Sequence, residues 1–398
     1  MRAIKVLHKI LLKSVPQMHL NRCHALTSAV ESLLYGAFLT VTALGRGLNR
    51  PAYAKHNIKC VDRLLSNPHL HKERHPIYQA LCQSLCAALP QPVILVDWSD
   101  IVEQDRLMLI RAALVVDGRA ITLYESIYTL KYYNKPRTHQ QFLRELKTLL
   151  PKQCIPIIVT DAGFRGPWFR AVEKLGWYWL GRVRNGVNYR LHSRQQWRRS
   201  TDLYYRANKR MRYLGPADLS SKRPYPCHLY LYKKPKQHRK ANRSVLHYAK
   251  HSNSDVFEKQ QTDPWLIATN LAPEVVSPKR IMQLYGKRMQ IEEAFRDLKS
   301  DKFGFGLTLS RSKNIERLNI LLLIAALATL CLWWVGLYAQ QQGWQRHFQA
   351  NTVTDRKVLS IPFLALQVLQ RPDYPIMLYD LEPILQALIK LIKQRNEG

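Results

Sequence analysis

Apolar residues recur along this chain with two different spacings, and the spacing changes twice. In residues 1–90 they fall every three or four positions, which predicts helices. Residues 91–340 combine short continuous apolar runs with helical segments, the pattern of a mixed α/β sheet. Residues 341–398 return to the helical spacing, most clearly over 379–393. The chain is therefore predicted to contain an α/β core domain between two helical regions.

The N-terminal region is predicted to carry a helix-turn-helix unit. Three short helices are expected, near 20–35, 40–48 and 54–66. Lys55, Lys59 and Arg63 are spaced four residues apart, so they would lie on one face of the last of these helices. Such a face either binds DNA phosphates or is simply solvated, and the spacing alone leaves both interpretations open.

The central region begins after Pro90-Gln-Pro92 with apolar runs that predict strands. The expected strands cover 93–96, 107–116, 121–128, 155–159 and 177–184, with helices over 138–150 and 166–175. Asp117-Gly118 lies between the second and third runs and predicts a hairpin turn. This order of strands and helices is that of a mixed sheet.

Residues 185–265 are predicted to form a β-rich insertion in this core. From 181 to 250 there are nineteen Lys or Arg residues against two acids, Asp202 and Asp218, with aromatic residues interleaved. Cationic groups bind phosphates and aromatic rings stack on bases, so this stretch fits a nucleic-acid surface. Its polar tip is expected over 234–262.

The charge of the whole chain supports the same partner. The formal net charge is +33, from 61 Lys and Arg against 28 Asp and Glu. A basic excess of this size favours nucleic acid as the partner, with an anionic membrane as the competitor. The 7 cysteines show no zinc-binding spacing, and we expect reduced thiols and no signal peptide.

One apolar segment could be mistaken for a membrane anchor. Residues 318–339 carry no charge and are long enough to span a bilayer. A helix that is apolar all round can equally be the centre of a soluble domain. Because there is a single such segment and it follows a highly charged helix, we expect buried core and no membrane.

Three acids are candidates for a metal site. Asp97 and Asp161 each follow a nearly continuous apolar run, where a ligand site opens in α/β sheets. Glu292, from a helix across the sheet, would be the third ligand. Oxygen ligands without Cys or His suit Mg²⁺ or Mn²⁺, and two such ions can activate a water or a 3′-hydroxyl on a phosphodiester. Asp161 could instead be a turn former, and Asp100 or Glu293 could be a ligand instead.

A helix predicted over 278–300 places phosphate-binding groups beside Glu292. At about 100° per residue, Tyr285, Arg288, Glu292 and Lys299 would lie within about 60° of one another. The buried face of this helix is expected to comprise Leu284, Ile291, Phe295 and Leu298.

These residues resemble a known family. The spacing Tyr-(2)-Arg-(3)-Glu-(6)-Lys, preceded by Asp-Trp-Ser-Asp at 97–100 and Thr-Asp-Ala-Gly-Phe at 160–164, is similar to that of DDE transposases of the insertion-sequence-four family. The resemblance covers nearly the whole chain, apart from 190–262 and about the final 40 residues.

The resemblance implies a fold and a reaction. The fold would be ribonuclease-H-like, with Asp97, Asp161 and Glu292 binding Mg²⁺, and Tyr285, Arg288 and Lys299 gripping phosphates. The reaction would be cut-and-paste transposition through a DNA hairpin, followed by joining of the 3′-hydroxyl to target DNA. Trp98, beside the first acid, could stack on an extruded base or belong to the core.

The implied partners are double-stranded DNA, both terminal inverted repeats and target, and a second copy of the chain in a synaptic complex. The location would be the bacterial cytoplasm, at the nucleoid. A ribonuclease-H-like nuclease without strand transfer, a non-catalytic DNA-binding protein and a basic membrane protein are the alternatives.

Overall fold

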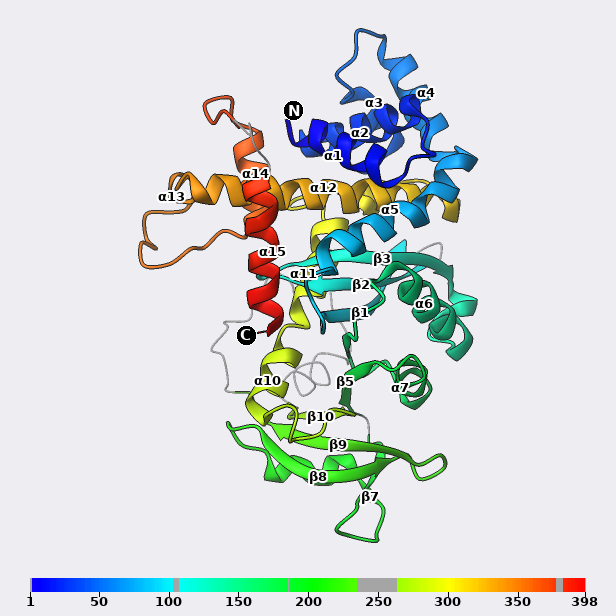
Figure 1. Ribbon diagram of the computed structural model, residues 1–398, viewed down its shortest axis with the longest axis vertical. Coiled ribbons are helices and arrows are strands. Elements are labelled where there is room, and N and C mark those ends of the chain that lie inside the picture. Colours follow the sequence, from blue (N-terminus) through cyan, green and yellow to red (C-terminus); the bar gives the residue numbers. More distant parts are fainter. Residues whose placement is uncertain (1, 103–106, 185, 235–262, 377–381, 398) are drawn as a thin grey trace, which may run out of the picture. The chain divides into compact units, whose positions relative to one another are not determined.

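The computed structural model of this protein describes residues 2–102, 107–184, 186–234, 263–376 and 382–397 (Figure 1). Its contacts divide the chain into two compact units: the first joins Met1–Pro156 to Met289–Gly398, and the second is Ile157–Arg288. The predicted domain boundaries near 90 and 340 concern a different division and stay a prediction, as does the ribonuclease-H-like fold.

The sheet of the first unit has three antiparallel strands, β1 (Val93–Val102), β2 (Leu107–Val115) and β3 (Ala120–Thr129), paired in the order β3-β2-β1. These strands were predicted, but β1 is longer than expected. It does not end at Asp97, because Trp98, Ser99 and Asp100 pair with Ile110, Leu109 and Met108 of β2. Asp97 therefore lies within a strand, contrary to its predicted place at the end of one.

Five helices precede this sheet, and they include the three that were predicted. They are α1 (Arg2–Ser14), α2 (Leu20–Leu34), α3 (Val41–Arg46), α4 (Ala54–Leu65) and α5 (Pro68–Cys86). In α4 the apolar side chains Val61, Leu64 and Leu65 are buried, while the opposite face is polar. Helices α2, α3 and α4 pack against one another, so the periodicity correctly predicted a helical cluster.

The apolar segment around 318–339 forms α12 (Ile315–Gln341), which is the central helix of the first unit. Figure 1 shows it running between the N-terminal helices and the sheet, and it contacts α2, α5 and β3. By length and composition this helix of the described chain could cross a membrane, but 94% of its most apolar window is buried inside the protein. Such burial is typical of a core helix.

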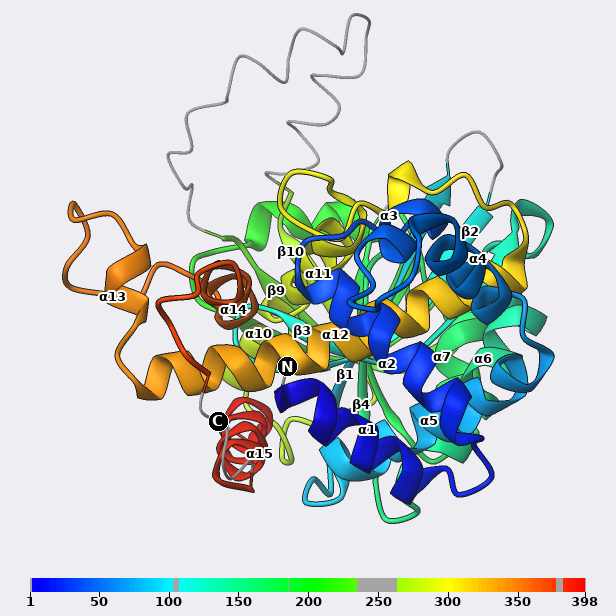
Figure 2. The same ribbon diagram turned by 90° about the horizontal axis from the view of Figure 1, so that it is seen from above.

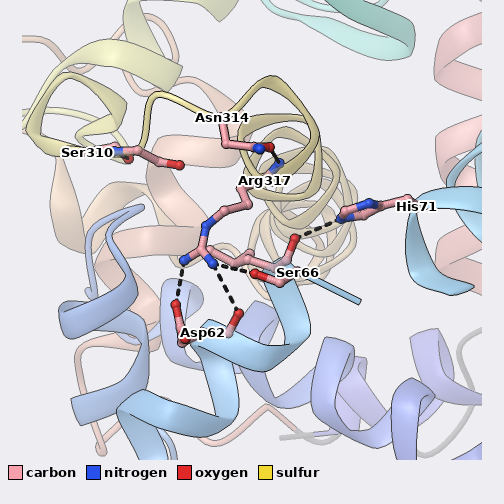
Figure 3. Close-up of polar contacts among 8 residues, drawn as sticks. Asp62, Ser66, His71, Ser310, Asn314 and Arg317 are labelled. Carbon is pink, nitrogen blue, oxygen red and sulfur yellow. Dashed lines mark hydrogen bonds and ion pairs between the residues drawn. The ribbon is translucent and has the colours of Figure 1, made fainter. Parts of the chain in front are cut away.

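Polar contacts fasten the first turn of α12 to the N-terminal helices. Arg317 forms an ion pair of 2.6 Å with Asp62 of α4 and also donates to the hydroxyl of Ser66 (Figure 3). His71 of α5 lies 3.3 Å from Glu316. Residues some 250 positions apart in sequence are thereby held together.

The remaining helices of the first unit are α6 (Pro136–Leu149), α11 (Met289–Lys299), α13 (Gln345–Phe348), α14 (Ile361–Leu369) and α15 (Glu382–Glu397), with short 3₁₀ turns at Leu130–Tyr132 and Leu307–Leu309. Figure 2 shows α14 beside the C-terminal half of α12. A Cβ atom on Gly336 of α12 would come within 2.1 Å of the carbonyl oxygen of Ile361, so a glycine is required at this contact. The predicted helix over 379–393 corresponds to α15, and residues 377–381 lie outside the described residues.

The second unit contains a mixed sheet. Its strands are β4 (Ile157–Thr160), β5 (Tyr178–Val183), β6 (Asn188–Leu191), β7 (Arg198–Arg199), β8 (Arg212–Leu219), β9 (Tyr225–Tyr232) and β10 (Trp265–Thr269). They are ordered β4-β5-β10-β9-β8-β6-β7, with β4 and β5 parallel and the other neighbours antiparallel.

Helical segments of the second unit are α7 (Gly166–Glu173), α10 (Pro278–Gly286) and a 3₁₀ stretch at Ser200–Arg206. Strands β6 to β9 fall in the stretch predicted as a β-rich insertion. The tip predicted over 234–262 lies outside the described residues, except for Lys234.

Candidate active site

Asp97 lies in the middle of β1, directly opposite Arg111 of β2. Its side chain is half-buried, and its Oδ1 accepts a hydrogen bond of 2.8 Å from the backbone N–H of Trp98. Side chains that are directly opposite in an antiparallel pair lie on the same face of the sheet. The position of Arg111 therefore identifies the face to which Asp97 belongs.

That face is the one covered by α11. The guanidinium carbon of Arg111 lies 4.9 Å from the centre of the Phe295 ring, and α11 packs against β1 and β3. Arg111 is almost fully buried and forms an ion pair of 2.7 Å with Glu125. The structure thus brings the strand of Asp97 and the helix of Glu292 into contact within one unit.

On α11, the two adjacent glutamates have different surroundings. Glu293 lies 3.4 Å from Arg119 and also contacts Arg296, so it belongs to an ion-pair cluster on the side of the helix. Glu292 is exposed, one position after buried Ile291. The role of Glu292 as the catalytic acid stays a prediction.

Lys299, at the last turn of α11, reaches the far part of β1. Its Nζ lies 3.2 Å from Oδ1 of Asp100 and donates to the Asp100 carbonyl at the same distance. Asp100 was the alternative to Asp97 as a metal ligand. In this structure its carboxylate neutralises a predicted phosphate-binding lysine.

Trp98 lies among aromatic side chains. Its ring centre is 5.2 Å from that of Tyr133 and 5.9 Å from that of Tyr128, and its Nε1 donates to Nε2 of His139 of α6 at 3.1 Å. Burial lowers the pKa of His139 to about 4, so the ring is a neutral acceptor near pH 7. These contacts are those of a packed residue, and the role in base stacking stays a prediction.

In the second unit, Asp161 directly follows the last residue of β4, as predicted. Its Oδ1 accepts a hydrogen bond of 2.8 Å from the backbone N–H of Gly163. The turn-forming role is therefore present, and it also fixes the orientation of a half-exposed carboxylate at the end of a parallel strand.

Tyr285 and Arg288 also belong to the second unit, and here one prediction was wrong. The expected single helix over 278–300 is interrupted: α10 ends at Gly286 and α11 begins at Met289. Gly286 weakens the helix, and the N–H of Arg288 bonds to the Tyr285 carbonyl in a tight turn at 3.1 Å. The alignment of Tyr285 with Glu292 and Lys299 was derived for one unbroken helix, and it stays a prediction because Tyr285 and Glu292 belong to different units. The predicted buried stripe is confirmed, since Leu284, Ile291, Phe295 and Leu298 are all buried.

Tyr285 is 3% exposed and lies in a small charged cluster of the second unit. Burial raises the pKa of Tyr285, while Arg288, which bonds to its hydroxyl, and Arg182 lower that pKa; Asp161 raises it. The Tyr285 phenol therefore lies close enough to Asp161, Arg182 and Arg288 for their charges to shift its pKa. The sequence did not single out Trp265, whose ring centre lies 4.9 Å from that of Tyr285. Trp265 and Tyr285 belong to different elements, so no spacing within one helix or strand predicts this contact, and only the structure identifies it.

The three basic residues predicted on α4 are exposed, as a binding face requires. Lys59 and Arg63 line a cavity of about 560 Å³ together with Arg22 and Arg50. Arg22 is an ion-pair partner of Glu73. The N-terminal helices therefore present a concentrated positive surface.

The metal site itself stays a prediction. Among the described residues, no group of three or more His, Cys, Asp or Glu side chains is gathered in the way that a metal ion requires. Asp97 and Glu292 are in the first unit and Asp161 is in the second. The donor chemistry fits Mg²⁺ or Mn²⁺, because all three are carboxylates.

Comparison with known protein families identifies a domain in this chain. A family model described as a transposase DDE domain matches residues 88–329, more than half of the chain. The matched region includes every residue discussed on β1, β4, α10 and α11. No curated protein matches the chain.

Proposed function

This chain belongs to the family with a transposase DDE domain, and we propose that it is a cut-and-paste transposase of a bacterial insertion sequence of the insertion-sequence-four type. The observation that carries the proposal is the family match over 88–329, which includes all three predicted acids. Short motifs at 70–74, 96–100, 173–180 and 348–353 also resemble the transposase of the tetracycline-resistance composite transposon. A DDE transposase is a DNA-cleaving enzyme, so the substrate is DNA.

The proposed metal ligands are Asp97, Asp161 and Glu292, with two Mg²⁺ or Mn²⁺ ions. Such ions, when bound, make a water nucleophilic near neutral pH and stabilise the charge on a leaving oxygen. The contribution of the chain is orientation. Backbone N–H groups hold the carboxylates of Asp97 and Asp161 through hydrogen bonds of 2.8 Å each, and α11 packs on β1 with Glu292 exposed.

The proposed phosphate-binding residues act on the DNA end. Arg288 and Lys299 carry donors that pair strongly with phosphate oxygens, and the Tyr285 hydroxyl can donate a further hydrogen bond. Because burial raises the pKa of Tyr285, its hydroxyl keeps its proton near pH 7 and is a donor. Holding the cut end is what a transposase needs and a simple nuclease does not.

The proposed reaction has four phosphoryl transfers. Water attacks a phosphodiester at each end of the element and releases a 3′-hydroxyl. That 3′-hydroxyl attacks the opposite strand and closes a hairpin, a second water opens the hairpin, and the same hydroxyl then joins target DNA. Trp98 is proposed to support an extruded base in the hairpin. If Trp98→Ala forms hairpins as fast as the wild type, this role is excluded.

The proposed assembly is a synaptic complex with two copies of the chain, one for each DNA end. The exposed Lys55, Lys59 and Arg63 of α4 would contact the terminal inverted repeat. A net charge of +33 suits a protein of the bacterial cytoplasm that associates with the nucleoid. We propose no membrane role, in accord with the burial of α12.

A cleavage assay tests this function. A labelled duplex with the inverted repeat that flanks the encoding element is incubated with the protein and Mg²⁺, and products are resolved on a denaturing gel. We expect a nick at the repeat end, then a hairpin. Glu292→Gln should abolish both, while the adjacent Glu293→Gln should retain them.

Other results would indicate other functions. Nicks without hairpins or joined products would indicate a nuclease. Binding without cleavage by the wild type would indicate a non-catalytic DNA-binding protein.

A further inference from the structure

Positively charged side chains line a cleft in the second unit, next to Asp161. Its volume is about 610 Å³, and it is formed by the β4–α7 connection, the end of β5 and the β8–β9 turn. The cationic side chains that line it are Arg165, Arg170, Arg182, Arg184, Lys222 and Arg223. Among the described residues that line it, none is an acid. Such a concentration of one sign calls for an anion.

Five of the six cations divide into an inner and an outer group, and the sixth, Arg184, lies 4.0 Å from the carboxylate of Asp263. Inside, Arg170 donates to the carbonyls of Arg223 and Pro224, and its guanidinium lies 5.4 Å from the centre of the Tyr225 ring. Arg182 donates to the Asp263 carbonyl at 3.0 Å. These backbone contacts hold the guanidinium groups in place without removing their charge.

The outer group consists of Arg165, Lys222 and Arg223, which are exposed at the rim. Long cationic side chains on a rim can adjust to an extended polyanion, whereas the inner arginines provide fixed positions. The cleft thus has a rigid floor and an adaptable edge.

Buried donors in the cleft provide a second, independent observation. Tyr225 lines the cleft and is 2% exposed, yet its hydroxyl has no hydrogen-bond partner among the described residues. The Nε of Arg182 is likewise buried without a partner. Unsatisfied buried donors are rare because they lose their bonds to water. Both atoms are closed to solvent in this structure, so a ligand with acceptor oxygens would have to displace the side chains that cover them to form these bonds.

Location and size identify the anion. Ala162, adjacent to Asp161, is part of the lining. The positive charge of Arg182, which also lines the cleft, lowers the pKa of Tyr285 in the charged cluster. The volume and the spread of six cations exceed what one phosphate ion needs. We propose that this cleft binds consecutive phosphates of the DNA strand that passes the scissile phosphodiester at Asp161. This inference rests on the proposed transposase function and adds to it a specific binding surface.

Two variants of the full-length protein test it. In the first, Arg165→Gln, Lys222→Gln and Arg223→Gln together remove the rim charges. Its matched control removes three exposed charges from and beside α6: Arg144→Gln, Lys147→Gln and Lys152→Gln. In the second, Tyr225→Phe removes only the unpartnered hydroxyl. Binding of a labelled repeat duplex is measured by fluorescence anisotropy across a range of salt concentrations.

The rim variant should bind the repeat duplex roughly 10- to 100-fold more weakly than the α6 control. The slope of the logarithm of its binding constant against the logarithm of the salt concentration should be smaller in magnitude by about 2 to 3. Tyr225→Phe should bind about tenfold more weakly while keeping or raising the melting temperature, since an unsatisfied hydroxyl is removed. A purely structural role for Tyr225 would leave binding unchanged. If the rim variant binds the repeat and joins DNA like the α6 control, the proposal is wrong.

A second experiment distinguishes whether the cleft binds the end of the element or the target DNA. Precut repeat ends are joined to a target plasmid by each variant. If the rim variant binds the repeat normally but joins poorly, the cleft holds target DNA; if repeat binding falls, it holds the element end. Wild-type protein that neither nicks nor joins would refute the transposase function, whereas an active wild type with an unaffected rim variant would refute the cleft alone.

Discussion

The guanidinium of Arg111 lies 4.9 Å from the centre of the Phe295 ring, and this contact joins the sheet that carries Asp97 to the helix that carries Glu292. Arg111 is directly opposite Asp97 in the β1–β2 ladder, and Phe295 follows Glu292 by one helical turn. Arg111, a buried cation, therefore lies between the strand and the helix that carry two predicted catalytic acids.

Arg111→Met should destabilise the protein strongly. It leaves the carboxylate of Glu125 buried without its cation, which typically costs about 3–5 kcal/mol. Adding Glu125→Gln should recover much of the loss, because the charge is removed while an oxygen stays for the hydroxyl of Tyr78. Urea unfolding of both variants measures the difference. Equal stability of the single and double variants would contradict this coupling.

Asp100→Asn should strengthen DNA binding without abolishing cleavage. The substitution frees Lys299 for phosphate and removes one negative charge, so we expect affinity to rise roughly two- to fivefold. Because the pair is solvent-exposed, the free energy of unfolding should change by less than about 1 kcal/mol. Anisotropy and the cleavage gel provide the measurements. Loss of Mg²⁺-dependent cleavage would instead identify Asp100 as a metal ligand.

His139 should make the stability depend on pH. Burial lowers its pKa from 6.5 to about 4, so between these values the unfolded chain binds a proton that the folded protein does not. This contribution is complete above pH 6.5 and is lost as the pH falls toward 4, to a total of about 3 kcal/mol. Thermal or urea unfolding from pH 7 to 4 should show a smaller decline for His139→Gln. An equal decline for His139→Gln and the wild type would contradict this prediction.

Gly336→Ala should weaken the contact between α12 and α14. The added Cβ would lie 2.1 Å from the Ile361 carbonyl oxygen, and such overpacking typically costs about 1–3 kcal/mol. Gly286→Ala is the matched control, since a Cβ there meets no atom within 4 Å and alanine favours helix. A Gly336→Ala protein as stable as the control would show that the two helices can separate at no cost.

Local patterns predicted much of the candidate site. The spacing of apolar residues located the strand that contains Asp97, the strand that precedes Asp161 and the buried face of α11, because one residue in two or in 3.6 must face the core. It could not locate Trp265 beside Tyr285, nor the cleft lined by Arg165 and Tyr225, because these contacts join residues that are distant in sequence.

What the sequence by itself determined is the type of each long element, the basic character of the chain and the membership of its core in the transposase DDE family. What only the tertiary structure decided is how those elements continue and what covers them. β1 runs past Asp97 because β2 supplies hydrogen-bond partners, and α12 is a core helix because other helices and β3 surround it. Apolar periodicity is a local property, whereas strand length and burial depend on neighbours that only folding brings together.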